Sequence, residues 1–154
     1  MILLSKTELE ALGYVASLRY NVNRKAGVKD VKMGSKEDPL EIMMIGLIAE
    51  YAFCKKFNIF QDLSSEPRSG TYDCLTPSGK RVDIKATRRR NGNLVRTMKE
   101  NNDVDTYVLA VVDDNAAVEF IGWIAKEDFI KPENIKDLGY GKTYFLAREH
   151  LNKF

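Results

Sequence analysis

Residues 80–87 read Lys80-Arg81-Val82-Asp83-Ile84-Lys85-Ala86-Thr87 and, from Arg81 onward, alternate between polar and apolar side chains. Successive side chains of a β-strand point to opposite faces of the sheet. The stretch therefore predicts a strand whose apolar residues face a core, while Asp83 and Lys85 share the opposite face.

A second strand is expected just before this one, at residues 71–75. The two are separated by Thr76-Pro77-Ser78-Gly79, in which proline presets its φ angle and glycine accepts a positive one. Two strands joined by such a turn predict a hairpin. The hairpin would bring Asp73 into the neighbourhood of Asp83.

Two helices are expected before the strands. Ser5 and Glu8 have the spacing of a capping box, so a helix should begin at Ser5 and reach about Tyr20. Asp38 is a suitable N-cap for a second helix, which should reach Phe57. This second helix is apolar on nearly all sides, which predicts a central, buried position.

The rest of the chain predicts further strands and loops. The β-branched run 107–112 suits a strand buried on both faces. We expect strands also at 118–124 and 144–146, a short helix at 126–129, and connections at 21–35, 58–70 and 88–93. Helices followed by strands, with one helix buried, predict an α/β or α+β fold with a mixed β-sheet packed by helices.

Composition narrows the function classes. The 154 residues suit one domain, and 24 basic against 22 acidic residues argue against a protein that binds nucleic acid by bulk positive charge. The two cysteines are expected to be buried thiols. With only one histidine, the chain has too few ligands for a zinc site and too few histidines for most histidine-based catalysis. Without an apolar run of about 20 residues or a signal-peptide pattern, we expect no membrane partner and a cytoplasmic, intracellular location.

Glu50 is an anomaly in the second helix, because helical spacing places it on the apolar stripe. A buried carboxylate must be paired, ligate a metal or shift its pKa. The alternative is that Glu50 lies at the edge of the stripe and points to water. Gly46, one turn earlier, is costly inside a helix, and close approach of another backbone is the expected compensation.

Asp73, Asp83 and Lys85 form the second unusual set. Two neighbouring carboxylates repel unless a cation lies between them, and oxygen ligands favour Mg²⁺ or Mn²⁺. A lysine beside such an ion can orient or deprotonate a water and offset phosphoryl charge. The alternative is a solvated strand face with a surface Asp–Lys pair.

This pattern resembles the signature of the PD-(D/E)XK nuclease superfamily, in which an acidic residue precedes an Asp-x-Lys strand. Nine residues separate Asp73 from Asp83-Ile84-Lys85, and Glu50 matches the additional helical acid of that superfamily. The likeness is closest to small phage- and prokaryote-associated members and covers residues 35–147. Tyr72 stands where many members have proline.

The resemblance implies a restriction-endonuclease-like fold, a mixed sheet flanked by helices. It implies one nuclease-like domain over residues 1–154, with an N-terminal helix and connection at 1–34. Asp73 and Asp83 would ligate Mg²⁺ (or Mn²⁺), Glu50 would do so directly or through water, and Lys85 would act on the attacking water. The implied activity is hydrolysis of phosphodiester bonds in DNA, with RNA left open, in the host cell if the protein is phage-encoded.

Basic residues follow the expected catalytic strand. Residues 79–99 hold eight basic residues and one acidic residue, and lysine or arginine contacts to phosphate position a nucleic acid without reading its sequence. The alternative is a solvated charged face. Trp123 is expected in the core rather than stacked on a base. The expected nucleic-acid contacts are Arg68, Ser69, Thr87, Arg88, Arg89, Arg90 and Arg96.

Two other functions fit the same residues. One is a nucleic-acid-binding module that keeps the fold without turnover. The other is a Holliday-junction-resolvase-like endonuclease, which would act as a homodimer to cut two strands symmetrically.

Overall fold

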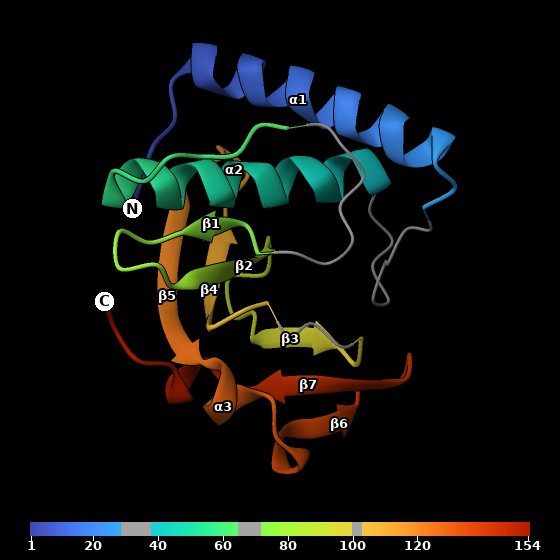
Figure 1. Ribbon diagram of the computed structural model, residues 1–154, viewed down its shortest axis with the longest axis vertical. Helices are drawn as coiled ribbons and strands as arrows, with labels where there is room; N and C mark the ends of the chain where they lie inside the picture. Colours follow the sequence, from blue (N-terminus) through green and yellow to red (C-terminus); the bar gives the residue numbers. More distant parts are fainter. Residues whose placement is uncertain (29–37, 65–71, 100–102) are drawn as a thin grey trace.

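The computed structural model describes residues 1–28, 38–64, 72–99 and 103–154. The chain forms a mixed α+β structure in which two long helices lie on one face of a four-stranded mixed sheet (Figure 1). A second, three-stranded sheet lies on the other side. The elements are α1 (Lys6–Lys25), α2 (Pro39–Phe57), β1 (Cys74–Leu75), β2 (Arg81–Thr87), β3 (Leu94–Thr97), β4 (Thr106–Val112), β5 (Val118–Ala125), α3 (Lys126–Phe129), β6 (Ile135–Asp137) and β7 (Lys142–Leu146), with single 3-10 turns at Pro132–Asn134 and Arg148–His150.

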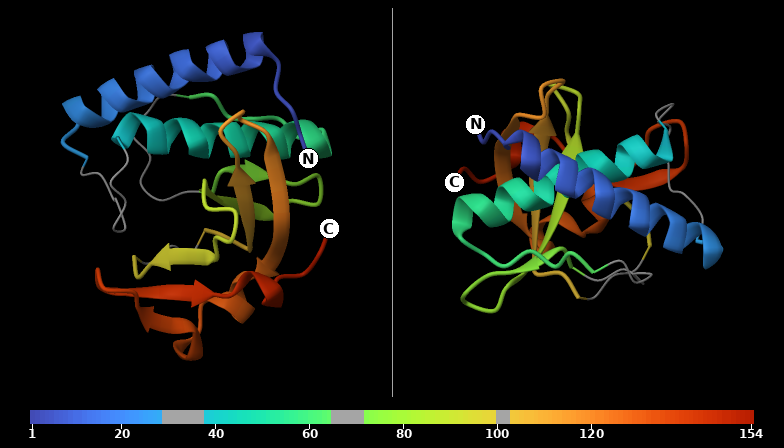
Figure 2. Two further views of the ribbon diagram at one scale, coloured as in Figure 1. Left: turned by 180° about the vertical axis from the view of Figure 1, so that it is seen from behind. Right: turned by 90° about the horizontal axis from the view of Figure 1, so that it is seen from above.

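Helix α2 begins and ends where its sequence predicts. The Asp38 side chain accepts a hydrogen bond from the Leu40 N–H at 3.2 Å, and Pro39 occupies the first turn. Asn58 ends the helix in the left-handed conformation. Seven residues of α2 are buried, so the prediction of a central helix is confirmed. From above, α1 crosses over α2 (Figure 2).

Helix α1 starts with the predicted capping box but is longer than expected. Ser5 and Glu8 satisfy each other's backbone N–H groups, and the helix continues to Lys25. The expectation of a connection from residue 21 is therefore wrong for 21–25. In that last turn the Arg24 guanidinium lies 4.9 Å from the centre of the Tyr20 ring, an i,i+4 contact that supports the extension. Residues 29–37 lie outside the described part of the chain.

The predicted alternation of β2 is confirmed. Val82 and Ile84 are buried in the core that α2 shares with the sheet. Asp83 and Lys85 therefore lie on the face of β2 that points away from α2. Strand β2 pairs antiparallel with β1 and parallel with β4, and the order of the larger sheet is β1-β2-β4-β5. The hairpin is confirmed, although β1 is only two residues long.

Strand β4 is buried on both faces, as predicted. Val108 packs toward α2, whereas Tyr107 and Leu109 belong to a second core against β3, α3 and the C-terminal segment. Strands β3 and β6 were not predicted, because three or four residues carry too little periodicity to be recognised. Trp123 packs against the first core and Cys54 and Cys74 are buried free thiols, so these three expectations are confirmed.

The helices bear on the expectation that the chain has no membrane partner. Over the described residues, no helix combines the length and the apolar character needed to cross a bilayer.

The expectation for Gly46 is wrong, and this leads to a prediction about stability. Among the described residues, an alanine Cβ at Gly46 would meet only the Glu50 Oε1 atom, at 4.0 Å, and no backbone of another segment. Because alanine favours a helix over glycine, we expect Gly46→Ala to raise the free energy of unfolding by about 0.5–1 kcal/mol in urea denaturation.

Gly122 on β5 provides the contrasting control. There a Cβ would lie 2.5 Å from the Asn152 carbonyl oxygen and 2.7 Å from the Leu151 Cβ. Gly122→Ala should force the C-terminal segment off β5 and cost about 1–3 kcal/mol. Equal changes in the two variants would contradict this account of the two glycines.

Candidate active site

Asp73 immediately precedes β1 and continues the hairpin with its side chain. Its backbone N–H donates to the Val82 carbonyl oxygen at 2.9 Å, and its Oδ2 accepts from the Ile84 N–H at 2.7 Å. The carboxylate thus takes the place that the next backbone carbonyl would take in the ladder. This hydrogen bond fixes Asp73 beside the start of β2.

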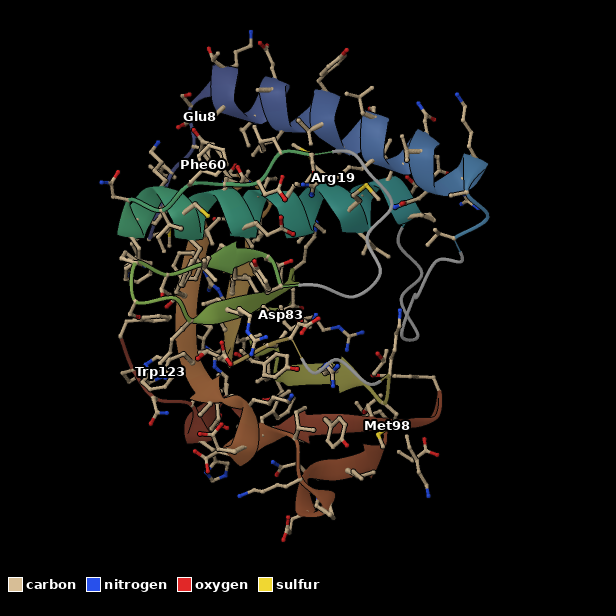
Figure 3. All side chains as sticks on the ribbon, viewed as in Figure 1. Glu8, Arg19, Phe60, Asp83, Met98 and Trp123 are labelled. Carbon is tan, nitrogen blue, oxygen red and sulfur yellow. The ribbon has the colours of Figure 1, made fainter. Side chains whose placement is uncertain are left out.

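Asp83 and Lys85 form a close ion pair on β2. The Lys85 Nζ lies 2.7 Å from the Asp83 Oδ1, and Asp83 is only 6% exposed. The alternative of a solvated surface pair is therefore wrong for Asp83. In Figure 3, Asp83 lies between helix α2 and strand β3. A carboxylate this buried needs its cation, because burial alone disfavours the charged form.

Glu50 is paired rather than solvated. Its side chain is 15% exposed, and its Oε2 lies 3.7 Å from the Nη1 of Arg19. The alternative in which Glu50 points to water is therefore wrong. Figure 3 shows Arg19 between α1 and α2, so the first helix supplies the counter-ion for the acid of the second.

The negative charges of Glu50 and Asp83 act on the carboxyl of Asp73. Burial, followed by the negative charges of Glu50 and Asp83, raises the pKa of the Asp73 carboxyl well above its ordinary value. The charge of Lys85 and the hydrogen bond from the Ile84 N–H act in the opposite direction but do not cancel this. A negative cluster of this kind gains stability when a cation enters it.

The donor set suits a hard divalent cation, since it contains carboxylate oxygens only. As they stand, the side chains of residues 1–28, 38–64, 72–99 and 103–154 include no group of three acidic, histidine or cysteine residues arranged to hold a metal ion. The acids come from different layers of the fold. Glu50 belongs to the helix that covers one face of the sheet, whereas Asp83 lies on the other face. Asp73, at the strand end, lies between them.

Two of the predicted nucleic-acid contacts are engaged inside the fold. The Nη2 of Arg88 lies 3.1 Å from the Glu41 Oε1, and its Nη1 donates to the Asp113 carbonyl oxygen at 3.2 Å. Arg96 is 7% exposed, donates to the Lys99 carbonyl oxygen at 2.7 Å and lies over the Tyr107 ring at 5.5 Å.

Arg89 and Arg90 differ from these two. Both are exposed, and their side chains make no hydrogen bond or ion pair with the described residues. The Thr87 Oγ1 accepts from the Arg89 N–H at 3.1 Å, so Thr87 shapes the turn that presents both arginines. Arg68 and Ser69 lie outside the described residues.

Arg19 and Tyr107 were missed by the sequence reasoning. Arg19 follows Leu12 and Ala16 at helical spacing, so it carried the same signal that singled out Glu50, a charge on an apolar stripe. Tyr107 pairs with Asp83 in the sheet register, and its buried hydroxyl has no hydrogen-bond partner within the described chain. Burial is the main cause that raises the pKa of Tyr107 to about 12. The sequence carries no comparable signal for Tyr107, because a tyrosine in a buried strand is ordinary.

The sequence matches a known protein family. Residues 1–120 match a family described as a family of unknown function (DUF5843), and this range spans α1, α2, β1 to β4 and the first three residues of β5. No curated protein matches the sequence.

The raised pKa of Asp73 leads to a prediction about pH. A carboxyl whose pKa is higher in the folded than in the unfolded chain holds its proton more tightly when folded. Stability should therefore fall as the pH rises from about 4, the unfolded value, through the folded one. In EDTA, the wild-type free energy of unfolding should decline more steeply between pH 4 and 8 than that of Asp73→Asn, which keeps an oxygen for the Ile84 N–H.

Asp105→Asn is the control, because the contribution of Asp105 to stability should depend on pH in the opposite direction. The side-chain hydrogen bond from Arg81 is the first cause that lowers the pKa of Asp105, so this carboxylate stabilises the fold above the unfolded pKa and loses that effect as pH falls. Its replacement should lower stability by a constant amount above about pH 5. Parallel curves for wild type and Asp73→Asn would contradict the description of Asp73.

Proposed function

The chain belongs to a family of unknown function (DUF5843), and we propose from the site itself that it is a metal-dependent nuclease that hydrolyses phosphodiester bonds in DNA. The observation that carries the proposal is the pair of buried Asp83 and partly exposed Lys85, at 2.7 Å, on a strand whose hairpin partner is preceded by Asp73. A lysine held against a buried acid beside a second acid is the arrangement that phosphodiester hydrolysis needs. The resemblance to the PD-(D/E)XK superfamily supports the same reading.

Each residue of the site has a role in this proposal. Asp73, Asp83 and Glu50 would hold Mg²⁺ or Mn²⁺. When bound, such an ion lowers the pKa of a bound water and offsets phosphate charge. Lys85, whose side chain is 37% exposed, can leave Asp83 to orient the attacking water and to donate to a phosphate oxygen. Asp83 holds Lys85 in place until then.

The turn after β2 would hold the nucleic acid. Asp83 and Arg89 are six residues apart, and β2 ends at Thr87 before the chain turns, so the two residues lie at most about 20 Å apart at about 3.3 Å per residue. This separation suits contacts to backbone phosphates away from the cleaved bond. A DNA substrate is consistent with action in the cytoplasm, or in the host cell if the protein is phage-encoded.

A non-catalytic DNA-binding module is the second candidate. The observation that favours it is the absence, among the described residues, of a group already arranged to hold a metal. Crystals soaked in millimolar Mn²⁺ separate the two. An ion among Glu50, Asp73 and Asp83 supports the enzyme, and an empty site supports the module.

Cleavage by variants tests the enzyme directly. Asp83→Ala and Lys85→Ala should each lower the Mg²⁺-dependent cleavage rate by about 10²–10⁴-fold, since each removes a group that acts on the reacting atoms. Asp128→Ala, at an exposed acid of α3, should cleave at the wild-type rate. The substrates should include single-stranded, duplex, flap and four-way-junction DNA together with RNA, and preference for the junction would identify a resolvase. Wild-type cleavage by Asp83→Ala would overturn the assignment.

Binding tests the role of the exposed arginines. Arg89→Gln and Arg90→Gln should each weaken DNA binding and reduce the slope of log K against log salt by about 1, because each removes one phosphate contact. Fluorescence anisotropy with Asp83→Ala as background measures binding without cleavage. Lys6→Gln, at a side chain 91% exposed on α1, is the matched control and should change neither quantity. An unchanged salt slope in both arginine variants would exclude them from the interface.

A further inference from the structure

Arg19 is a mostly buried cation that joins three parts of the chain. It lies on α1, and its side chain is 11% exposed. Its Nη1 lies 3.7 Å from the Glu50 Oε2 on α2, its Nε donates to the Ser64 carbonyl oxygen at 2.9 Å, and its Nη2 donates to the Asp62 carbonyl oxygen at 2.8 Å. All three nitrogen atoms of one guanidinium therefore face named acceptors.

The geometry of the guanidinium makes these three contacts interdependent. The group is planar and presents its N–H donors in fixed directions, whereas a lysine ammonium is a single point of charge on a flexible chain. Holding the two carbonyl groups of 62 and 64 fixes the plane of the guanidinium. That plane in turn fixes the direction from which Nη1 approaches Glu50.

One of the three acceptors of Arg19 belongs to the candidate site, and the other two lie in the segment that follows α2. Glu50 is one of the three acids of that site. Residues 58–64 follow α2 directly, and the chain from there leads to Asp73 and β1. A movement of Arg19 would therefore displace the acid of the helix and the segment that precedes the acid of the hairpin.

We propose that Arg19 is a positioning residue of the active site, which orients the Glu50 carboxylate toward the metal and holds residues 62–64 against the two helices. This inference rests on the proposed nuclease function and adds α1 to its machinery. Arg19 touches neither the substrate nor the reacting atoms; it acts through Glu50. The likeness that suggested the nuclease covered residues 35–147 and gave α1 no role.

Metal affinity is the measurement that a merely structural arginine would not change. Residues that orient metal ligands typically contribute 10–100-fold to metal affinity or activity. We expect Arg19→Gln to raise the Kd for Mn²⁺, measured by calorimetry in the absence of DNA, by about 10-fold or more. Turnover should fall by a similar factor, while KM for DNA stays unchanged because the arginines that contact DNA are untouched.

Hydrogen exchange and two further variants complete the experiment. Amides of residues 59–64 should exchange faster in Arg19→Gln, since their carbonyl tethers are lost. Arg19→Lys keeps the charge without the planar fork and should recover only part of the Mn²⁺ affinity, which guards against simple failure to fold. Arg24→Gln, at an exposed arginine of the same helix, is the matched control and should leave metal binding and turnover unchanged.

The outcomes separate this inference from the proposed function. If Asp83→Ala abolishes cleavage but Arg19→Gln binds Mn²⁺ and turns over like the wild type, Arg19 is only a structural tie and the inference is overturned. If Asp83→Ala cuts DNA at the wild-type rate, the proposed function fails and the inference falls with it. Loss of Mn²⁺ affinity in Arg19→Gln together with partial recovery in Arg19→Lys supports the inference.

Discussion

The packing of β2 against α2 is the contact on which the rest of the site depends. Val82 and Ile84 are buried beneath the helix. Because side chains of a strand alternate between its two faces, Asp83 and Lys85 lie on the opposite face. The same helix carries Glu50, whose position along α2 is fixed by the residues that pack around it. One apolar interface therefore positions Glu50 on the helix and Asp83 and Lys85 on the strand. Asp73 is held beside β2 because its side chain accepts a hydrogen bond from the Ile84 N–H.

The acids of the site differ in how their charge is balanced. Asp83 has Lys85 at 2.7 Å, and Glu50 has Arg19 at 3.7 Å. Asp73 has a backbone N–H as its hydrogen-bond donor and feels the negative charges of both other acids, which together with burial raise its pKa. A residue whose pKa is strongly shifted by burial and by specific charged neighbours is a candidate for a functional role. The location of this imbalance, between the helix and the strand, is the electrostatic reason to look for a cation there.

The basic residues show how a count of charges can mislead. The excess of positive charge in residues 79–99 is real, but Arg81 makes a bidentate pair with Asp105, Arg88 binds Glu41, and Arg96 is buried over Tyr107. These three arginines stabilise the sheet and its connections. Under the proposed function, fewer basic side chains remain for a nucleic acid than the sequence implies, and they include the exposed Arg89 and Arg90 of the turn after β2.

Much of the architecture follows from local patterns. The caps of α1 and α2, the two faces of β2 and the burial of β4 could all be read from spacing, because capping and periodicity act between residues close in the chain. The set of Glu50, Asp73, Asp83 and Lys85 was recognisable for the same reason, together with its resemblance to a known pattern. The short strands β3 and β6 were not, since their few residues become strands only by pairing with β7.

Only the tertiary structure decided which charges meet. Arg19 and Glu50 lie on different helices, and Arg88 reaches Glu41 because the end of β2 lies beside the start of α2. Periodicity determines which face a side chain occupies, but not which segment packs against that face. For this protein the sequence by itself determined a mixed sheet with a buried helix and a strand that displays an acid and a lysine. The packing of α1 on α2, and of the second sheet on the first, decided which acids are paired, which arginines are free and how far apart the three carboxylates stand.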